Sequence, residues 1–471
     1  MLTTAAGAAG RRRAITHRQS ALCDAFPFMA LPPELHTRPR TQTLRWMFRP
    51  IEFMEEARAR YGETFGVKFI GFKTPLYFTS DPTAAKAIYS NRGNTLPPGR
   101  NTVLEPVMGQ RSILLLEGAE HLARRKLMLP PFHGERMRAY EEVIQQVIDR
   151  EVDSWKIGEE FRIHPRMQSV TLEVILRAVF GVTEEARLAP MREVLGELAH
   201  KTASPWRQLL GLASQRFGRW GPWRFFEDMM GRVDARIYEE IRARRADPDL
   251  DQREDILSML IVARFEDGGE MSDSELRDQL VTLLLAGHET TATALAWTFD
   301  LLLRHPEALE RLRAEIEEGQ SEDYLRATIT ESLRLRPVVP IAGRRLAEET
   351  EIDGFTLPAG ADVSPAIYLS HTRPDVYPDP HAFKPERFLD GGPDTYSWVP
   401  FGGGVRRCLG ASFAEFEMRI VLREVLGRCR LEAASDQPEG VTRRNITFSP
   451  KRGTPVVLLE RSPAVAEPAL A

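Results

Sequence analysis

The stretch FGGGVRRCLG, residues 401–410, places Cys408 among four glycines and directly after two arginines. A cysteine binds metals as its thiolate, which positive charge and nearby backbone N–H groups stabilise. Here the glycines let the backbone turn closely around the sulfur, Arg406 and Arg407 add positive charge, and a predicted helix begins just after Cys408. One thiolate cannot hold zinc or an iron–sulfur cluster alone, but it can hold haem iron, whose equatorial ligands come from the porphyrin. The alternative is a glycine-rich turn around a buried, unreactive cysteine.

The composition narrows the class of protein. The chain has 471 residues and three cysteines, Cys23, Cys408 and Cys429, too few and too scattered for a disulfide framework or a four-thiolate metal site. We therefore expect a reducing, cytoplasmic location. With 42% hydrophobic residues, 28% charged residues and a net charge of −4, the composition is that of a globular protein, and we expect no nucleic-acid partner.

The spacing within the cysteine stretch is specific. Phe401, Gly404, Arg406, Cys408 and Gly410 match the pattern FxxGxRxCxG, and on these residues the chain resembles the cytochrome P-450 superfamily of haem-thiolate monooxygenases. The resemblance implies haem b as cofactor, with Cys408 as the axial iron ligand and Phe401, Arg406 and Gly410 contacting the haem.

The resemblance also predicts a supporting network. In ESLR, Glu331 and Arg334 have the spacing that puts two opposite charges on one helical face. This spacing alone is weak evidence for a supporting network, because Glu184 and Arg187 have the same spacing and are interpreted as a solvated pair. The later PERF stretch supplies Arg387, which in the family joins the Glu–Arg pair behind the haem. We expect these three to support the cysteine loop structurally.

A second chemical stretch is AGHETT, residues 286–291. Gly287 inside a helix costs about 1 kcal/mol relative to alanine, so it needs a reason. In the family, this helix crosses the oxygen-binding face of the haem, where a small residue leaves room and an acid–alcohol pair, here Glu289 and Thr290, relays protons. The alternatives are that Thr290 bonds a carbonyl one turn earlier and that Glu289 is a surface acid.

Haem carries two propionates, which need cationic partners. The resemblance predicts these partners among His121, Arg125, Arg344 and Arg406. Arg345 could replace Arg344, and His121 as an axial ligand is an alternative. The neighbours Arg124 and Lys126 are interpreted as solvated or partner-facing.

The elements around these motifs predict a mainly α fold with a small β portion. Residues 121–335 are almost entirely helical in pattern, and residues 279–303 are apolar nearly all round, as expected for the central helix of a large soluble protein. That segment could span a bilayer, but Glu289 and Asp300 would be costly there, so we expect no transmembrane anchor. A helix is expected at 51–62, ending on Gly62, and another at 411–428.

Strand patterns occur at 65–71, 75–80 and 453–460, with short strands and turns at 337–400, and a long functional loop is expected at 92–118. No repeat or linker divides the chain, so we expect one monooxygenase domain at 31–460 and a flexible tail at 461–471. Residues 1–30 are expected to be a disordered extension. They lack an apolar signal core, although a targeting segment and a start at Met29 are alternatives.

The resemblance implies a reaction in which one atom of O2 enters a C–H or C=C bond and the other leaves as water. Two electrons must come from NAD(P)H. The chain shows no glycine-rich dinucleotide fingerprint and no cysteines for a cluster, so a separate ferredoxin- or flavodoxin-type donor with its reductase is expected.

By family position, substrate contacts are expected from 96–116, 199–212, Leu283, Ala286 and 338–343, which are largely apolar. Such a pocket favours a lipophilic molecule such as a fatty acid, terpenoid, steroid or macrocycle, although these residues could be ordinary core. A thiolate-haem isomerase, dehydratase or peroxygenase is an alternative that would not need Glu289 and Thr290. A haem-based sensor or carrier without turnover is another.

Overall fold

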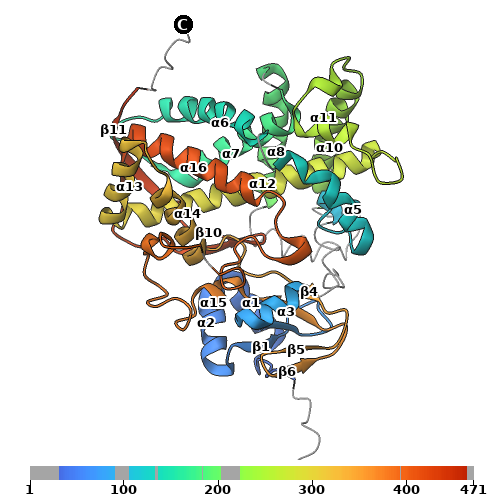
Figure 1. Ribbon diagram of the computed structural model, residues 1–471, viewed down its shortest axis with the longest axis vertical. Helices are drawn as coiled ribbons and strands as arrows, with labels where there is room; N and C mark the ends of the chain where they lie inside the picture. The colour runs from blue at the N-terminus through green and yellow to red at the C-terminus, as the bar shows by residue number, and fades with distance from the viewer. Residues whose placement is uncertain are drawn as a thin grey trace, which may run out of the picture.

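The computed structural model describes residues 31–90, 105–132, 136–182, 184–202, 223–392 and 394–463, and helices dominate them. Figure 1 shows a larger helical part and a smaller part in which the first helices lie against short strands. The helices of the larger part are α5 (Gly118–Met128), α6 (Arg136–Asp153), α7 (Ile163–Phe180), α8 (Glu185–Thr202), α10 (Trp223–Arg245), α11 (Ile256–Val262), α12 (Asp273–Leu303), α13 (Pro306–Glu318), α14 (Asp323–Leu335) and α16 (Ala411–Arg428).

Helix α12 forms the centre of the molecule. It begins six residues before the predicted start because Ser272 and Glu275 form a capping box: the Ser272 hydroxyl accepts from the Glu275 N–H, and the Glu275 carboxylate accepts from the Ser272 N–H. Most of its side chains are buried, as expected for a central helix. No helix among the described residues is both long and apolar enough to cross a membrane.

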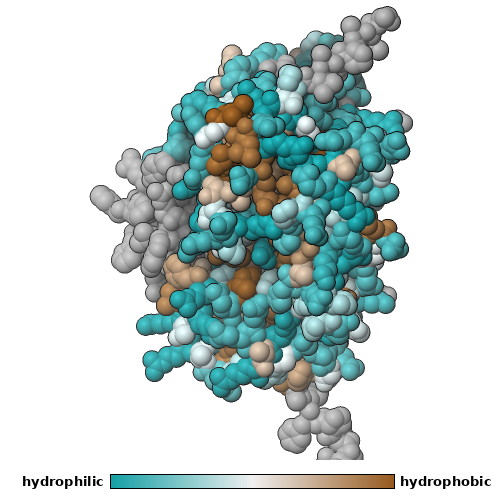
Figure 2. Space-filling model, turned by 90° about the vertical axis from the view of Figure 1, so that its left-hand side faces the viewer, coloured by the Kyte–Doolittle hydropathy of each residue, from teal (hydrophilic) through white to brown (hydrophobic). Residues whose placement is uncertain are grey.

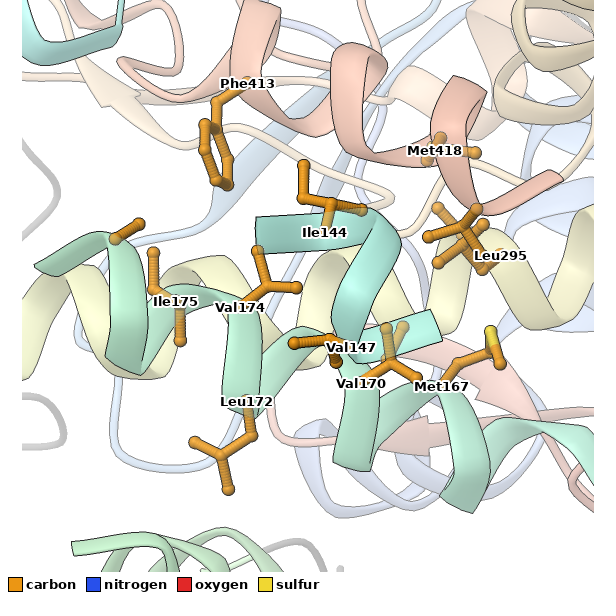
Figure 3. Close-up of a cluster of buried hydrophobic side chains, with 14 of the residues drawn as sticks. Ile144, Val147, Met167, Val170, Leu172, Val174, Ile175, Leu295, Phe413 and Met418 are labelled. Atoms are coloured by element: carbon orange, nitrogen blue, oxygen red, sulfur yellow. The ribbon is translucent and has the colours of Figure 1, made fainter. Parts of the chain in front are cut away.

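The core lies where α6, α7, α12 and α16 meet. Figure 3 shows Ile144 of α6, Val174 and Ile175 of α7, Leu295 of α12 and Phe413 of α16 among the side chains of this buried cluster. Helix α16 spans the predicted residues, and its packing against α6 and α12 holds the segment that follows Cys408. The face in Figure 2 is mostly hydrophilic with separate hydrophobic patches, as expected once the apolar faces are buried.

The smaller part combines the first helices with a sheet from two distant regions of the chain. Its helices are α1 (Pro39–Phe48), α2 (Pro50–Tyr61), α3 (Pro82–Ser90) and α15 (Ile367–His371). The four-stranded sheet has the order β1 (Thr64–Val67), β2 (Leu76–Thr79), β7 (Asp362–Pro365) and β4 (Arg344–Arg345), with β2 parallel to β7. Helix α2 ends as predicted on Gly62, whose φ is 91°. This sheet carries Arg344 on its edge strand.

Three further small sheets complete the fold. The strand β11 (Pro455–Arg461) lies between β3 (Glu160–Arg162) and β8 (Cys429–Ala433), so the predicted helical stretch 121–335 is interrupted at β3. The hairpins are β5 (Thr350–Ile352) with β6 (Phe355–Leu357), and β9 (Val441–Arg444) with β10 (Thr447–Pro450). Of the predicted loop at 92–118, residues 92–104 lie outside the described residues, and residues 105–108 are helical.

Candidate functional site

Residues 401–410, the cysteine loop, fold tightly around Cys408. A single 3-10 turn covers Gly404–Arg406, and the Cys408 N–H donates to the Phe401 carbonyl at 2.9 Å. The Gly410 N–H points at the Cys408 sulfur, and α16 begins at the next residue. The loop therefore presents one sulfur with a backbone donor directed at it, as its composition predicts.

Glycine is required at Gly404 for two reasons. Its φ is 64°, in the left-handed region, and an added Cβ would lie 2.2 Å from the backbone oxygen of Tyr89 in α3. A Cβ at Gly403 would likewise meet the Tyr89 ring at 2.6 Å. The glycines thus bring the cysteine loop against α3, an element more than 300 residues earlier in the chain.

Gly404→Ala is expected to destabilise the protein by about 2 kcal/mol or more, because alanine pays for the left-handed backbone and its methyl group overlaps Tyr89. Urea unfolding of the purified protein measures this loss. Gly392→Ala is the control, since Gly392 has ordinary φ and open space around it, and its stability should stay within about 0.5 kcal/mol of the wild type. Equal effects of the two changes would contradict the role assigned to Gly404.

We infer that the Cys408 thiol faces a hollow within the protein. Cys408 keeps accessible surface, yet surrounding protein desolvates the sulfur enough to raise its pKa, against the opposing effects of the Gly410 N–H and of the Arg407 and Arg125 guanidinium groups. These two observations agree if the accessible surface faces inward. A bound metal cation would favour the deprotonated form of this thiol and so offset the rise in pKa that burial causes.

Four basic residues converge beside this loop, and we call them the cation group: His121, Arg125, Arg344 and Arg406. Burial, and secondarily the positive charges of the three arginines, together lower the pKa of His121 to about 4. Among the described residues, no carboxylate lies within 4 Å of Arg125 or Arg344, and both guanidinium groups reach backbone carbonyls instead. This concentration of positive charge fits a ligand with two carboxylates, as the haem propionates are.

The structure corrects two expectations about neighbouring arginines. Arg124 is not solvated: its side chain is 2% exposed, pairs with Glu275 and lies over the Phe265 ring. Lys126 is exposed, as predicted. Arg345 does not replace Arg344, because Asp362 in β7 binds it through two hydrogen bonds of 2.9 and 3.1 Å. A sequence pattern cannot separate these adjacent arginines, since their environments come from distant segments.

The middle of α12 is accessible although the helix is otherwise buried. Ala286 is exposed, and Gly287 and Thr290 are partly so. The Thr290 hydroxyl donates to the Ala286 carbonyl at 2.6 Å, so the bond to a carbonyl one turn earlier, which the sequence analysis gave as an alternative, is present. The Thr290 oxygen can still accept a hydrogen bond. A Cβ at Gly287 would lie 3.4 Å from the Ile175 side chain of α7. The glycine therefore lies where α12 packs against α7. Its proposed role of leaving room for haem stays a prediction.

Glu289 is not a surface acid. Its carboxylate accepts from the Gln168 side chain of α7, and its other oxygen, which is buried without a hydrogen bond, lies 3.8 Å from Arg444 and 3.9 Å from His164. Burial raises the pKa of Glu289, while Arg444 and Gln168 oppose the rise. A raised pKa favours the protonated form of a carboxyl group and makes it better suited to exchange a proton near neutral pH.

Sequence reasoning missed His164, Gln168 and Arg444. His164 and Gln168 are four residues apart, so they lie on one face of α7, and that spacing is a signal that could have found them. His164 also contacts Thr293 of α12 at 3.2 Å and Arg444 at 3.4 Å. Arg444 comes from β9, and no local pattern marks it.

The predicted supporting network is present and buried. Arg334 binds Glu331 through two hydrogen bonds of 2.6 and 2.8 Å, and both side chains are fully buried. Arg387 approaches the same Glu331 oxygen at 3.4 Å, and the Lys384 N–H donates to it at 2.9 Å. The remaining Arg334 N–H groups donate to the carbonyls of His371, Pro380 and Ala382. By contrast, Glu184 and Arg187 are exposed and lie 4.0 Å apart, and the closer partner of Arg187 is Glu240 of α10.

His371 connects this network to the cysteine loop. Its Nδ1 contacts the Arg334 carbonyl at 3.1 Å, and its Nε2 lies 2.9 Å from the Val399 N–H, two residues before Phe401. Because Nε2 must accept from Val399, the ring is neutral with its proton on Nδ1. Trp398 adds a second link through its indole N–H, which donates to the Thr330 carbonyl of α14 at 3.1 Å. His371 is thus a positioning residue that the sequence analysis did not identify.

Stability is expected to fall in acid partly because His371 must stay neutral. Burial, and secondarily Arg334, lower its pKa to about 3 in the folded protein, against about 6.5 when unfolded. Between these two pH values the unfolded chain therefore binds more protons than the folded protein. As the pH falls below 6.5, His371 lowers the free energy of unfolding by about 1.4 kcal/mol per pH unit. In urea unfolding between pH 7 and 5, His371→Gln should show a shallower dependence on pH. Parallel curves would contradict this contribution.

Comparisons with known proteins agree with this arrangement. The family described as cytochrome P450 matches residues 36–456. Cytochrome P450 135B1 of Mycobacterium tuberculosis is 39% identical over 431 residues, covering 90% of this chain and 90% of that protein. Cytochrome P450 138 of the same organism is 34% identical over 447 residues, covering 93% and 98% respectively.

Two solved structures are similar in fold. The retinoic acid-bound cyanobacterial CYP120A1 has a TM-score of 0.78 and 25% identity, over 91% of this chain and 99% of that chain. The heme domain of cytochrome P450DA has a TM-score of 0.78 and 21% identity, over 93% and 99% of the two chains.

Proposed function

Because the chain belongs to the cytochrome P450 family and is a haem-dependent monooxygenase, we propose that it oxidises a lipophilic small molecule with electrons from a separate donor protein. The observation that carries the substrate class is the accessible middle of α12. There the partly exposed Leu283 and Leu285 and the exposed Ala286 interrupt an otherwise buried helix with an apolar surface. Such a surface favours a lipophilic ligand over a charged one.

The haem is held, in this proposal, by residues on two sides of the hollow. Cys408 supplies the thiolate ligand, and the cation group binds the propionates. When bound, haem supplies an iron that activates O2, with the thiolate increasing the electron density available for O–O cleavage. The chain's own contribution is to fix Cys408 through the Gly410 N–H, the Phe401 carbonyl and the Glu331–Arg334 network.

Glu289 and Thr290 manage protons in the proposed mechanism. Burial raises the pKa of Glu289, which favours its protonated form, and the Gln168 amide keeps its carboxyl group oriented. Thr290 donates to the Ala286 carbonyl and accepts a hydrogen bond at its oxygen, so it orients an incoming proton donor.

Thr290→Ala is expected to increase the peroxide released per NAD(P)H consumed by several-fold, because oxygen is then reduced without being transferred to substrate. The matched control is Thr291→Ala, since the Thr291 hydroxyl also donates to a carbonyl four residues earlier, that of Gly287, but is buried. Peroxide and product are quantified together in a reconstituted assay. If both variants uncouple equally, Thr290 has no special role.

The substrate class is tested with the purified haem protein. A library of fatty acids, terpenoids, steroids and macrocycles is screened for spin-state shifts of the haem, with polar molecules of matched size as the comparison set. Hits are incubated with NAD(P)H and either a ferredoxin or a flavodoxin, each with its reductase, and products are identified. The retinoic acid named for CYP120A1 is a lipophilic carboxylate and belongs in the library. Binding confined to polar molecules would overturn the proposal.

A further inference from the structure

A second cavity lies away from the cysteine loop, at the end of α14. It has a volume of about 210 Å³ and is bounded by α2, α12, α15 and the β9–β10 hairpin. Its apolar walls come mainly from Ile51, Trp297, Pro337, Val441 and Phe448. None of the residues that line it belongs to the cation group or the cysteine loop. We call it the Arg336 cavity, after the cation in its wall.

Arg336 enters this cavity without an acidic partner. Its Nη1 donates to the neighbouring Leu335 carbonyl at 3.2 Å, and its guanidinium lies 5.4 Å from the centre of the Trp297 ring. Its Nε is buried and makes no hydrogen bond. Among the described residues, no carboxylate lies within 4 Å of Arg336. A buried guanidinium of this kind is costly unless a ligand pairs with it.

The charged groups nearest Arg336 each have other partners. Asp300 and Glu55 are the acidic groups near Arg336, and Arg334 is the nearby cation. Asp300 accepts from Arg304 at 2.9 Å, and Arg334 is paired with Glu331. Glu55 accepts from the Tyr368 hydroxyl at 2.6 Å, so that carboxylate is already hydrogen-bonded. None of these groups forms an ion pair with Arg336, and its Nε keeps an unused N–H.

We propose that the Arg336 cavity binds a small carboxylate with a flat, apolar body, such as a single-ring aromatic acid. The carboxylate pairs with the Arg336 guanidinium, which offers unused N–H groups in a planar arrangement that suits two oxygens. The ring lies against Trp297, Phe448 and the aliphatic wall. The volume fits this class, because a cavity of about 150 Å³ accepts benzene.

The site is distinct from the proposed substrate site, so the two can be tested apart. Benzoate is titrated into the purified haem protein by calorimetry, and benzyl alcohol serves as the neutral analogue of nearly the same shape. We expect one benzoate site and at least about tenfold weaker binding of benzyl alcohol, because a charge-assisted pair is lost. Imidazole, added to saturate the haem iron, should leave benzoate binding unchanged.

Arg336→Met should weaken benzoate binding at least about tenfold while leaving benzyl alcohol unaffected. Arg443→Met is the matched control, since Arg443 is also a largely buried arginine lying 5.4 Å from a tryptophan ring, that of Trp46, but it does not line the cavity. This control should bind benzoate like the wild type. Unchanged affinity in Arg336→Met would overturn the proposal, as would competition by imidazole or absence of benzoate binding to the wild type.

A cavity-filling change guards against a misfolded Arg336 variant. Val441→Phe keeps Arg336 but places a larger side chain in the cavity wall, so it should abolish benzoate binding without altering the absorption spectrum of the haem. Should Arg336→Met fail to fold, this variant and the wild-type comparison of benzoate with benzyl alcohol decide the matter. Benzoate binding to Val441→Phe with wild-type affinity would place the ligand elsewhere and overturn the assignment.

Discussion

Cys408→Ser is expected to abolish the thiolate-type absorption of the reduced, CO-bound protein and to reduce product formation to the background rate. The physical reason is that serine offers an oxygen that stays protonated in the hollow where burial already raises the pKa of the thiol. The change removes one sulfur and leaves the backbone of the cysteine loop free to keep its Phe401 hydrogen bond. The measurement is a spectrum of the purified variant alongside product analysis.

Cys429→Ser is the matched control for this experiment. Cys429 is the other cysteine among the described residues, and it is buried at the end of α16, in the core cluster and not in the cysteine loop. Its replacement should cost some stability but leave the thiolate-type spectrum intact. Cys408→His adds a ligand of a different kind and should give an imidazole-type spectrum. A thiolate-type spectrum in Cys408→His would refute the assignment of Cys408.

Arg334→Ala is expected to reduce the free energy of unfolding by about 3–5 kcal/mol, because the fully buried Glu331 carboxylate loses its closest charge partner and keeps only Arg387 at 3.4 Å. The loss should be accompanied by poor haem retention, since the carbonyls of His371, Pro380 and Ala382 then lose the guanidinium that binds them. Urea unfolding and the haem content of the purified protein measure the two effects.

The chain contains its own control for this prediction. Glu184 and Arg187 have the same spacing, but Glu184 is 64% exposed and its distance to Arg187 is 4.0 Å. Glu184→Ala should therefore change stability by less than about 1 kcal/mol. If Arg334→Ala cost no more than this surface change, burial of the Glu331–Arg334 pair would not be its main contribution.

Local sequence determined the elements that carry the chemistry. The pattern around Cys408 predicted the helix that follows, because helix starts depend on neighbouring residues, and its resemblance to a known family predicted the haem-thiolate class. The apolar run of α12 indicated a central helix for the same reason, and the spacing of Glu331 and Arg334 placed them on one face of α14. Only the family resemblance, however, distinguished this pair from Glu184 and Arg187.

Tertiary structure decided the environments of the side chains. Burial in the folded protein raises the pKa of Glu289, while Gln168 from α7 and Arg444 from β9, each more than 100 residues away in the chain, oppose the rise. Likewise, Asp362 binds Arg345 while Arg344 joins the cation group, although the two are adjacent in sequence. Local patterns report backbone preference, whereas burial and charge pairing depend on which distant segments pack together, and that information exists only in the folded chain.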